Sequence, residues 1–215
     1  MIRYLIFLIW VNSCFTVYSQ RIWYADVTPG LSLVPPVPLV VKQEGGETIR
    51  LWARYGSAPL KRPYYYSVRV GTTDDTGSWE LEMNHLKVYL RNRPSEIGRF
   101  SISHGYNQLL INRAGRAGRL NAKAGLGIVA AHPENMVRGL KLDENQGIFR
   151  KGYYISGLVV QVGVWKKIHL KNSIYLLLES KISAAYASVP VVNGKAGVPV
   201  LAFHLQAGPG FVTGR

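Results

Sequence analysis

The chain is short of cysteine, of acidic residues and of long apolar runs. Its 215 residues include one cysteine, Cys14, which excludes an internal disulfide and a cysteine-rich zinc site. There are 12 Asp and Glu against 26 Lys and Arg, which gives a formal net charge of +14. After residue 20 no apolar run approaches the ~20 residues of a spanning helix, so a polytopic helical membrane protein is excluded. Intrinsic disorder is excluded because 47% of the residues are hydrophobic.

Residues 1–20 are typical of a cleaved secretory signal peptide. Arg3 supplies a positive start, residues 4–11 are apolar, and small residues precede a cleavage point near Gln20. Cleavage leaves a mature chain without cysteine, which suits an oxidising periplasm. Two alternatives stay open: a buried N-terminal element, and lipidation at Cys14 despite the unusual Asn12 two positions before it.

After residue 48, period-2 alternation recurs and helical periodicity is hard to find. Several segments reach the ~9–11 residues that cross a bilayer as a tilted strand. The eight predicted strands are 49–55, 63–71, 77–90, 98–112, 118–131, 151–165, 171–187 and 198–212. Short polar turns (72–76, 112–117, 166–170) alternate with longer connections (56–62, 91–97, 132–150, 188–197). Even strand number and sorted loops predict an all-β fold, an eight-stranded antiparallel up-and-down transmembrane β-barrel.

The two faces of each predicted strand differ in polarity. Trp79 and Leu81 alternate with Glu80 and Glu82, and similar alternation recurs in the last two strands. An apolar face toward lipid and a polar face toward the interior is the arrangement of a membrane barrel. An eight-stranded barrel is just wide enough for side chains to fill it, so we expect a plugged interior of paired charges. The residues expected there are Arg50, Arg54, Arg69, Glu80, Glu82, Lys123, Glu179, Lys181 and His204.

Residues 21–47 are set apart from the barrel, which is expected to occupy 48–215. This segment holds several prolines and glycines, including Pro29, Pro35 and Pro36, and proline interrupts a central strand. It is predicted to lie along the barrel mouth or to serve as a periplasmic lead-in, and the sequence does not decide between them.

Candidate catalytic residues are few and unspecific in spacing. Ser101 or Ser103 with His104 supplies a nucleophile and a base, and Glu80, Glu82 or Glu134 an orienting acid. In a regular strand His104 faces away from both serines, so the three meet only if a bulge intervenes. His132 and Glu134 with Asp143 and Glu144 have metal-ligating side chains at irregular spacing, and we favour a solvated loop. No metal and no cofactor is predicted.

Basic residues are expected at both ends of the barrel. At the long-loop end guanidinium and ammonium groups suit the phosphates of lipopolysaccharide. A basic chain invites a nucleic-acid interpretation, which export and lipid-facing strands disfavour. The glycines of 115–127 lie in a turn and a strand rather than before a helix, so no phosphate loop is predicted. The lipid-headgroup rim is predicted to contain Lys61, Arg62, Arg91, Arg93, Lys141 and Lys151.

Four stretches of the chain are distinctive: WELEMNHLKVYL (79–90), RFSISHGYNQLLINR (99–113), AHPE (131–134) and 179–210. Together they resemble a family of small bacterial outer-membrane β-barrel proteins of uncharacterised function. The resemblance spans roughly 48–212 and implies an exported barrel without an activity to carry over. Such barrels usually end on an aromatic residue that the barrel-assembly machinery reads, whereas here Phe211 is followed by four residues.

The sequence therefore predicts a barrel in the outer membrane of a Gram-negative bacterium, with a structural or binding role carried by its long loops. Two other functions stay open. One is a lipid-modifying hydrolase or acyltransferase of that membrane. The other is a soluble periplasmic lipocalin-like carrier, which requires Leu176, Leu178, Phe203 and Leu205 to line the interior.

Overall fold

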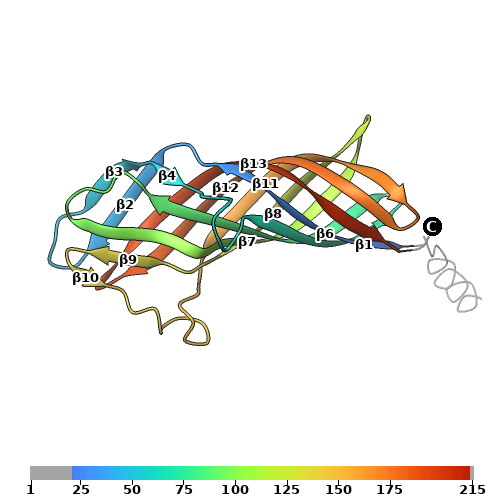
Figure 1. Ribbon diagram of the computed structural model, residues 1–215. Coiled ribbons are helices and arrows are strands. Elements are labelled where there is room, and N and C mark those ends of the chain that lie inside the picture. The colour runs from blue at the N-terminus through green and yellow to red at the C-terminus, as the bar shows by residue number, and fades with distance from the viewer. Residues whose placement is uncertain (1–20, 214–215) are drawn as a thin grey trace, which may run out of the picture.

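The computed structural model describes residues 21–213 and shows an antiparallel β-barrel with an extension at one end (Figure 1). The predicted signal peptide and Cys14 lie outside the described residues. Eight strands close the ring in the order in which they follow one another along the chain, and β7 pairs with β6 to complete it. They are β1 (Ile22–Leu33), β5 (Tyr66–Asp74), β6 (Gly77–Leu90), β7 (Ile97–Ala117), β8 (Leu120–Ala131), β11 (Tyr154–Lys171), β12 (Ile174–Val191) and β13 (Gly194–Val212).

The prediction of eight antiparallel strands is confirmed, but one member of the set is wrong. The expected first strand, 49–55, lies outside the ring, and β1 takes its place between β13 and β5. The boundary expected at residue 48 is therefore wrong, since the ring begins at Ile22. Pro29 is tolerated because its neighbourhood is missing from the β1–β13 ladder, which pairs Asp26 with Gly210 and resumes at Gly30 with Gln206. In this gap the Gln206 side chain donates to the Thr28 carbonyl at 3.3 Å.

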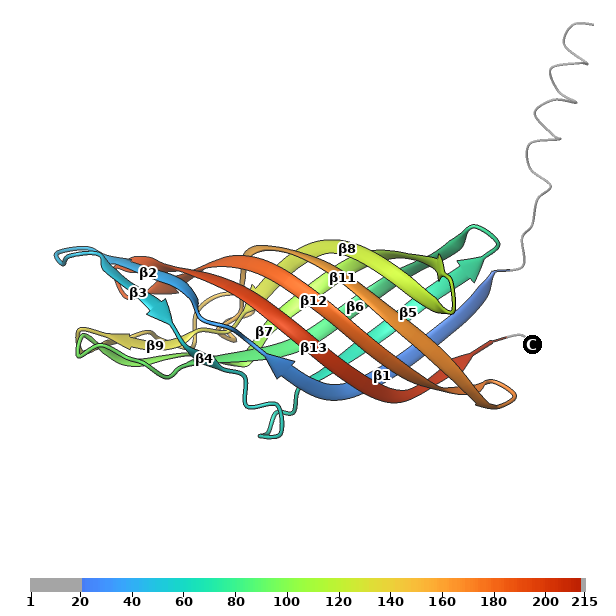
Figure 2. The same cartoon turned by 90° about the horizontal axis from the view of Figure 1, so that it is seen from above.

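Short turns and both ends of the described chain lie at one end of the barrel (Figures 1 and 2). There β5 meets β6, β7 meets β8 and β11 meets β12 through two-residue turns. The opposite end carries the longer segments 34–65, 91–96 and 132–153. The long loop expected at 188–197 is wrong, because β12 and β13 continue through it and join by a two-residue turn.

At the long-loop end the sheet continues past the ring. The strands that belong to this extension are β2 (Val37–Gln43), β3 (Ile49–Ala53), β4 (Tyr55–Gly56), β9 (Glu134–Val137) and β10 (Leu140–Lys141). On one side β2 pairs with β13 and β3 with β2; on the other, β9 pairs with β7 and β10 with β9. An apolar core that includes Leu39, Val137 and Val189 lies between them.

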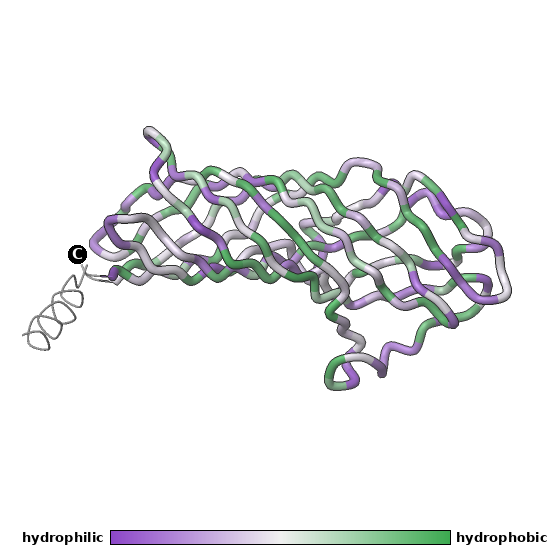
Figure 3. The backbone as a smooth tube through the Cα atoms, turned by 180° about the vertical axis from the view of Figure 1, so that it is seen from behind, coloured by the Kyte–Doolittle hydropathy of each residue, from purple (hydrophilic) through white to green (hydrophobic). Residues whose placement is uncertain are grey.

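Hydrophobic and hydrophilic residues alternate along the ring strands (Figure 3). In the ring the apolar set faces outward: Val162, Ile182 and Phe203 are exposed and directly paired on β11, β12 and β13. Leu178 and Leu205 are exposed as well, so they do not line an interior cavity as a lipocalin-like carrier requires. In the extension this relation is inverted, since Val189 and Val198 are buried while Ser188 and Lys195 are exposed.

Candidate functional site

The interior of the ring contains a network of ionised side chains, each of them almost completely buried. Arg69 contacts Asp26 at 3.1 Å, Glu179 at 3.1 Å and Glu80 at 3.4 Å. Lys123 reaches Glu179 at 2.6 Å, Glu82 at 2.7 Å and Glu80 at 3.8 Å. Each cation therefore faces two or more carboxylates, which is the pairing that buried charges need.

The remaining predicted interior residues complete the network or lie outside it. Lys181 pairs with Glu82 and lies 3.7 Å from Glu179. His204 lies between the Tyr65 hydroxyl at 2.7 Å and the Ser183 hydroxyl at 2.8 Å. Arg50 and Arg54 are exposed in and after β3, so the prediction that they point inward is wrong. Their assignment depended on counting β3 as a ring strand.

Amide side chains and a glycine make room for this network. Glu82 accepts hydrogen bonds from Gln161 at 2.7 Å and from Asn112 at 2.8 Å, and Gln161 donates to the Asn112 carbonyl oxygen at 2.7 Å. Gly125 lies on β8 between Asn112 and Gln161. A Cβ there would lie 1.8 Å from Oδ1 of Asn112, so only glycine allows the two amides to meet.

A second polar cluster lies where β7 leaves the ring. Between Leu86–Tyr106 and Val88–Ile102, one residue of β6 opposes three residues of β7, which is a bulge. Gly105 in this bulge has φ +131°, a conformation that L side chains rarely adopt. The backbone N–H of His132 donates to the Gly105 carbonyl at 3.1 Å, and the Tyr153 hydroxyl donates to the His104 carbonyl at 3.0 Å. These two bonds fix the bulge.

The bulge brings His104 to the same carboxylate as Ser103. Nδ1 of His104 lies 2.7 Å from Oε1 of Glu134, and Ser103 donates to that same oxygen. Arg99 binds the other carboxylate oxygen. Ser101 donates instead to the Glu134 backbone carbonyl at 3.4 Å. The structure thus joins Ser101, Ser103, His104 and Glu134, whereas Glu82 lies in the interior network.

This geometry differs from a serine–histidine–acid relay. Such a relay places the nucleophile on one imidazole nitrogen and the acid on the other. Here the Ser103 hydroxyl is 3.4 Å from Nδ1 of His104, and Glu134 is on that same nitrogen. Ser103 therefore binds the acid rather than the base.

His132 joins the cluster from the segment between β8 and β9. Its ring lies 4.9 Å from that of His104 and 5.0 Å from that of Tyr153, centroid to centroid. The residue is 8% exposed, and its Nδ1 has no hydrogen-bond partner. Burial, and then the neighbouring His104, lower the pKa of His132, which favours the neutral imidazole. One ligand atom each from His104, His132 and Glu134 lie within 4.8 Å of one another.

The two other acids that were weighed as metal ligands, and not favoured as such, have different partners. Asp143 accepts from the backbone N–H of Asn145 at 2.9 Å, and Glu144 pairs with Lys141 at 3.5 Å. The six predicted rim residues are all exposed at the long-loop end: Lys61, Arg62, Arg91, Arg93, Lys141 and Lys151. The structure brings none of these six into the His104 cluster.

Two segments project sideways from the wall at this level. Figure 2 shows residues 57–65 and Figure 1 residues 142–153 extending away from the barrel. Each segment carries an exposed apolar side chain: Leu60 is 76% and Phe149 89% exposed. Buried Lys87 donates from Nζ to the Lys61 carbonyl at 2.7 Å and ties the first segment to β6.

No protein-family model and no curated protein matches the chain, and the similarities found are to solved structures. The crystal structure of Ail, the attachment invasion locus protein of Yersinia pestis, is 11% identical, covers 87% of this chain and 98% of its own, and has a TM-score of 0.40. The outer membrane protein AlkL in lipid bilayers is 15% identical, covers 92% of each chain and has a TM-score of 0.47. Neisserial surface protein A is 12% identical, covers 90% of this chain and 97% of its own, and has a TM-score of 0.38.

The barrel fold of this chain follows from its own strand pairing. Within residues 21–213 there is no helix long and apolar enough to span a membrane.

Proposed function

We propose that this chain is an outer-membrane β-barrel with a closed interior and a structural or binding role at its long-loop end. The observation that carries the proposal is the inversion of polarity along the strands. In the ring, charge is inside and apolar side chains are outside; in the extension, the apolar side chains are inside. A wall with apolar side chains outside is stable in lipid, and a wall with apolar side chains inside is stable in water.

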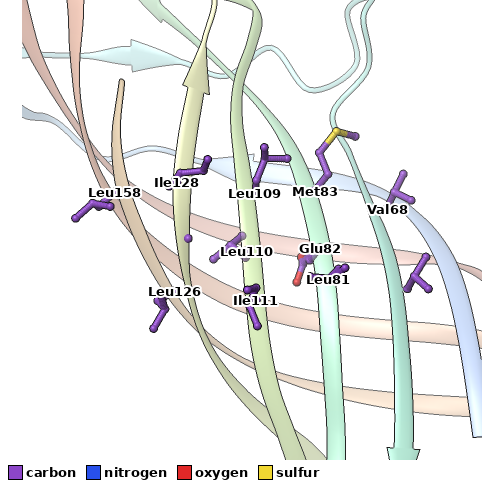
Figure 4. Close-up of a pocket in the computed structure, with 12 residues that line it drawn as sticks. Val68, Leu81, Glu82, Met83, Leu109, Leu110, Ile111, Leu126, Ile128 and Leu158 are labelled. Carbon is purple, nitrogen blue, oxygen red and sulfur yellow. The ribbon is translucent and has the colours of Figure 1, made fainter. Parts of the chain in front are cut away.

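The outer wall of the ring has the properties of a lipid-facing belt. Leu126 and Leu158 are 69% and 71% exposed, and a shallow apolar groove runs between the side chains of β5, β6, β7, β8 and β11 (Figure 4). Near the short turns, Trp23, Trp79 and Phe211 are exposed. Tryptophan and other aromatic rings are enriched at membrane–water interfaces, so this set marks the periplasmic edge. Phe211 on β13 is also the candidate signal for the barrel-assembly machinery.

Packed side chains at three levels support a closed interior. A cluster that includes Tyr24, Trp165 and Tyr175 lies toward the short-turn end, and the ion network lies above it. The apolar core of the extension begins above His204, with Val200 and Ala202. This succession leaves no role as a general-diffusion porin.

The rim cations and the two lateral segments support contact with lipid headgroups. Leu60 is followed by Lys61 and Arg62, and Phe149 by Arg150 and Lys151, all of them exposed. An apolar side chain beside a cation suits an anionic membrane surface. We therefore assign the phosphates of lipopolysaccharide as their partner. A nucleic-acid partner has no support in this arrangement.

Cell fractionation followed by electrophoresis of boiled and unboiled samples tests the location. We expect an outer-membrane band that requires detergent and whose mobility changes on boiling. Conductance in planar bilayers tests the plug, and we expect the purified protein to conduct no ions. A soluble periplasmic protein of constant mobility would overturn the first assignment, and steady channels would overturn the second.

A further inference from the structure

We propose that His104, His132 and Glu134 bind a divalent transition-metal ion, with Zn²⁺ as the ion that suits them best. Two imidazoles and one carboxylate form a known zinc ligand set, and a fourth position is then filled by water. The site lies at the β7 bulge, in the extension and outside the lipid belt.

The geometry of the three ligands is close to what a tetrahedral ion needs. Zn–N and Zn–O bonds of ~2.0–2.2 Å place ligand atoms roughly 3.3 Å apart. Here Nδ1 of His104 and Oε1 of Glu134 are 2.7 Å apart, and all three ligand atoms lie within 4.8 Å. Changes of up to about 1.5 Å in their separations therefore bring them to tetrahedral spacing, and the side chain of His104, 59% exposed, leaves an open path for water.

His132 gives an independent reason to place a ligand here. It is more than nine-tenths buried, yet its Nδ1 is not hydrogen-bonded. A buried polar atom without a partner is unfavourable, and a bound ion removes that cost. The other edge of the ring is packed against Gly152, where an added Cβ would lie 2.5 Å from Nε2. Ring orientation is thus fixed by packing.

Residues that hydrogen-bond to the Glu134 carboxylate hold it in one orientation, as the hydrogen-bond partners of a metal ligand do. Arg99 occupies one carboxylate oxygen, which leaves Oε1 for the ion, and Ser103 donates to Oε1. The Tyr153 hydroxyl holds the His104 backbone through its carbonyl. Such contacts fix ligand geometry and contribute to affinity.

The test uses the mature full-length protein, purified in detergent without a histidine tag and stripped with a chelator. Isothermal titration with ZnCl₂ is expected to give one ion per chain, and Co²⁺ is expected to give the visible absorption of a tetrahedral site. His132→Ala should weaken Zn²⁺ binding by roughly 100-fold or more, because even an outer partner of a ligand contributes about 10- to 100-fold. Glu134→Gln keeps the side-chain volume and should cause a similar loss.

Two control variants separate this site from others. His169→Ala alters a histidine at the short-turn end. Asp143→Asn alters an acid that was weighed from the sequence as a metal ligand. Neither variant should change the affinity for Zn²⁺. The boiled and unboiled gel checks that every variant is folded. Absence of stoichiometric binding in the wild type, or equal affinity in folded His132→Ala and Glu134→Gln, would overturn the proposal.

Discussion

Replacing Lys123 by methionine tests whether the interior of the ring is dry. The Lys123 ammonium group has no exposed surface and contacts Glu82 at 2.7 Å, Glu179 at 2.6 Å and Glu80 at 3.8 Å. At an effective dielectric constant of ~20, each contact corresponds to roughly 4–6 kcal/mol of gross Coulombic attraction. Desolvation of the ions offsets most of this sum. Methionine keeps the length of the side chain but leaves the carboxylates short of a cation.

The free energy of unfolding is therefore expected to fall by about 3–5 kcal/mol, the cost of breaking a buried ion pair by removing one partner. The measurement is urea unfolding in lipid vesicles, followed by tryptophan fluorescence. Lys166→Met is the matched control, because Lys166 is an exposed lysine on β11, and its effect should stay within about 0.5 kcal/mol. Adding Glu82→Gln to Lys123→Met removes one of the excess buried carboxylates, while Lys181 still faces Glu179 at 3.7 Å, and should recover about 1 kcal/mol or more.

A solvated interior gives a different result. Water would screen the three carboxylates, and Lys123→Met would then resemble the Lys166→Met control. That outcome would refute the plugged interior, and it should coincide with ion conductance in planar bilayers.

Other variants test the lipid belt and the glycine in the network. Ile182→Arg and Ser188→Arg change two residues on the same outward face of β12; the first should cost about 2–4 kcal/mol on folding into vesicles and the second close to nothing, because only Ile182 lies in the apolar belt. Equal effects would contradict the inferred edge of the bilayer. Gly125→Ala should destabilise the barrel by about 1–3 kcal/mol, since its Cβ would lie 1.8 Å from Asn112, whereas Gly115→Ala, with nothing within 4 Å, should not. Urea midpoints of the two glycine variants measure the difference.

Much of the ring was predictable because strict alternation leaves few choices of register. The strand predicted at 77–90 has the same bounds as β6, since charged and apolar residues alternate between a polar turn and a loop. The first ring strand was not predictable in the same way. Pro29 argues against a strand by its own chemistry, and the contact that permits it, from Gln206, comes from the far end of the chain. The wrong inward placement of Arg50 and Arg54 has the same origin, because 49–55 was counted as a ring strand in place of β1.

The His104 cluster depended on a feature that alternation hides. A regular strand separates His104 from Ser103, and the structure unites them on Glu134 through the bulge at Gly105. A glycine inside an otherwise alternating strand is one signal of a bulge, and at Gly105 the φ of +131° is unfavourable for other residues. The position of His132 in the cluster could not be predicted from the sequence, because its backbone N–H reaches the Gly105 carbonyl only in the folded chain.

Strand β12 shows why periodicity and polarity give separate information. Its odd-numbered residues face inward from one end to the other, so the period of 2 never changes. Their chemistry does change: Glu179, Lys181 and Ser183 are followed by Ala187 and Val189. The period identifies which residues share a face. Their polarity identifies the surroundings of the strand, because charged inward residues accompany an apolar outer face and apolar inward residues a polar one. In the proposed outer-membrane placement, the change after Ser183 is where this strand leaves lipid for water, and the proposed metal ligands lie on the water side of that boundary, where an ion from solution has access.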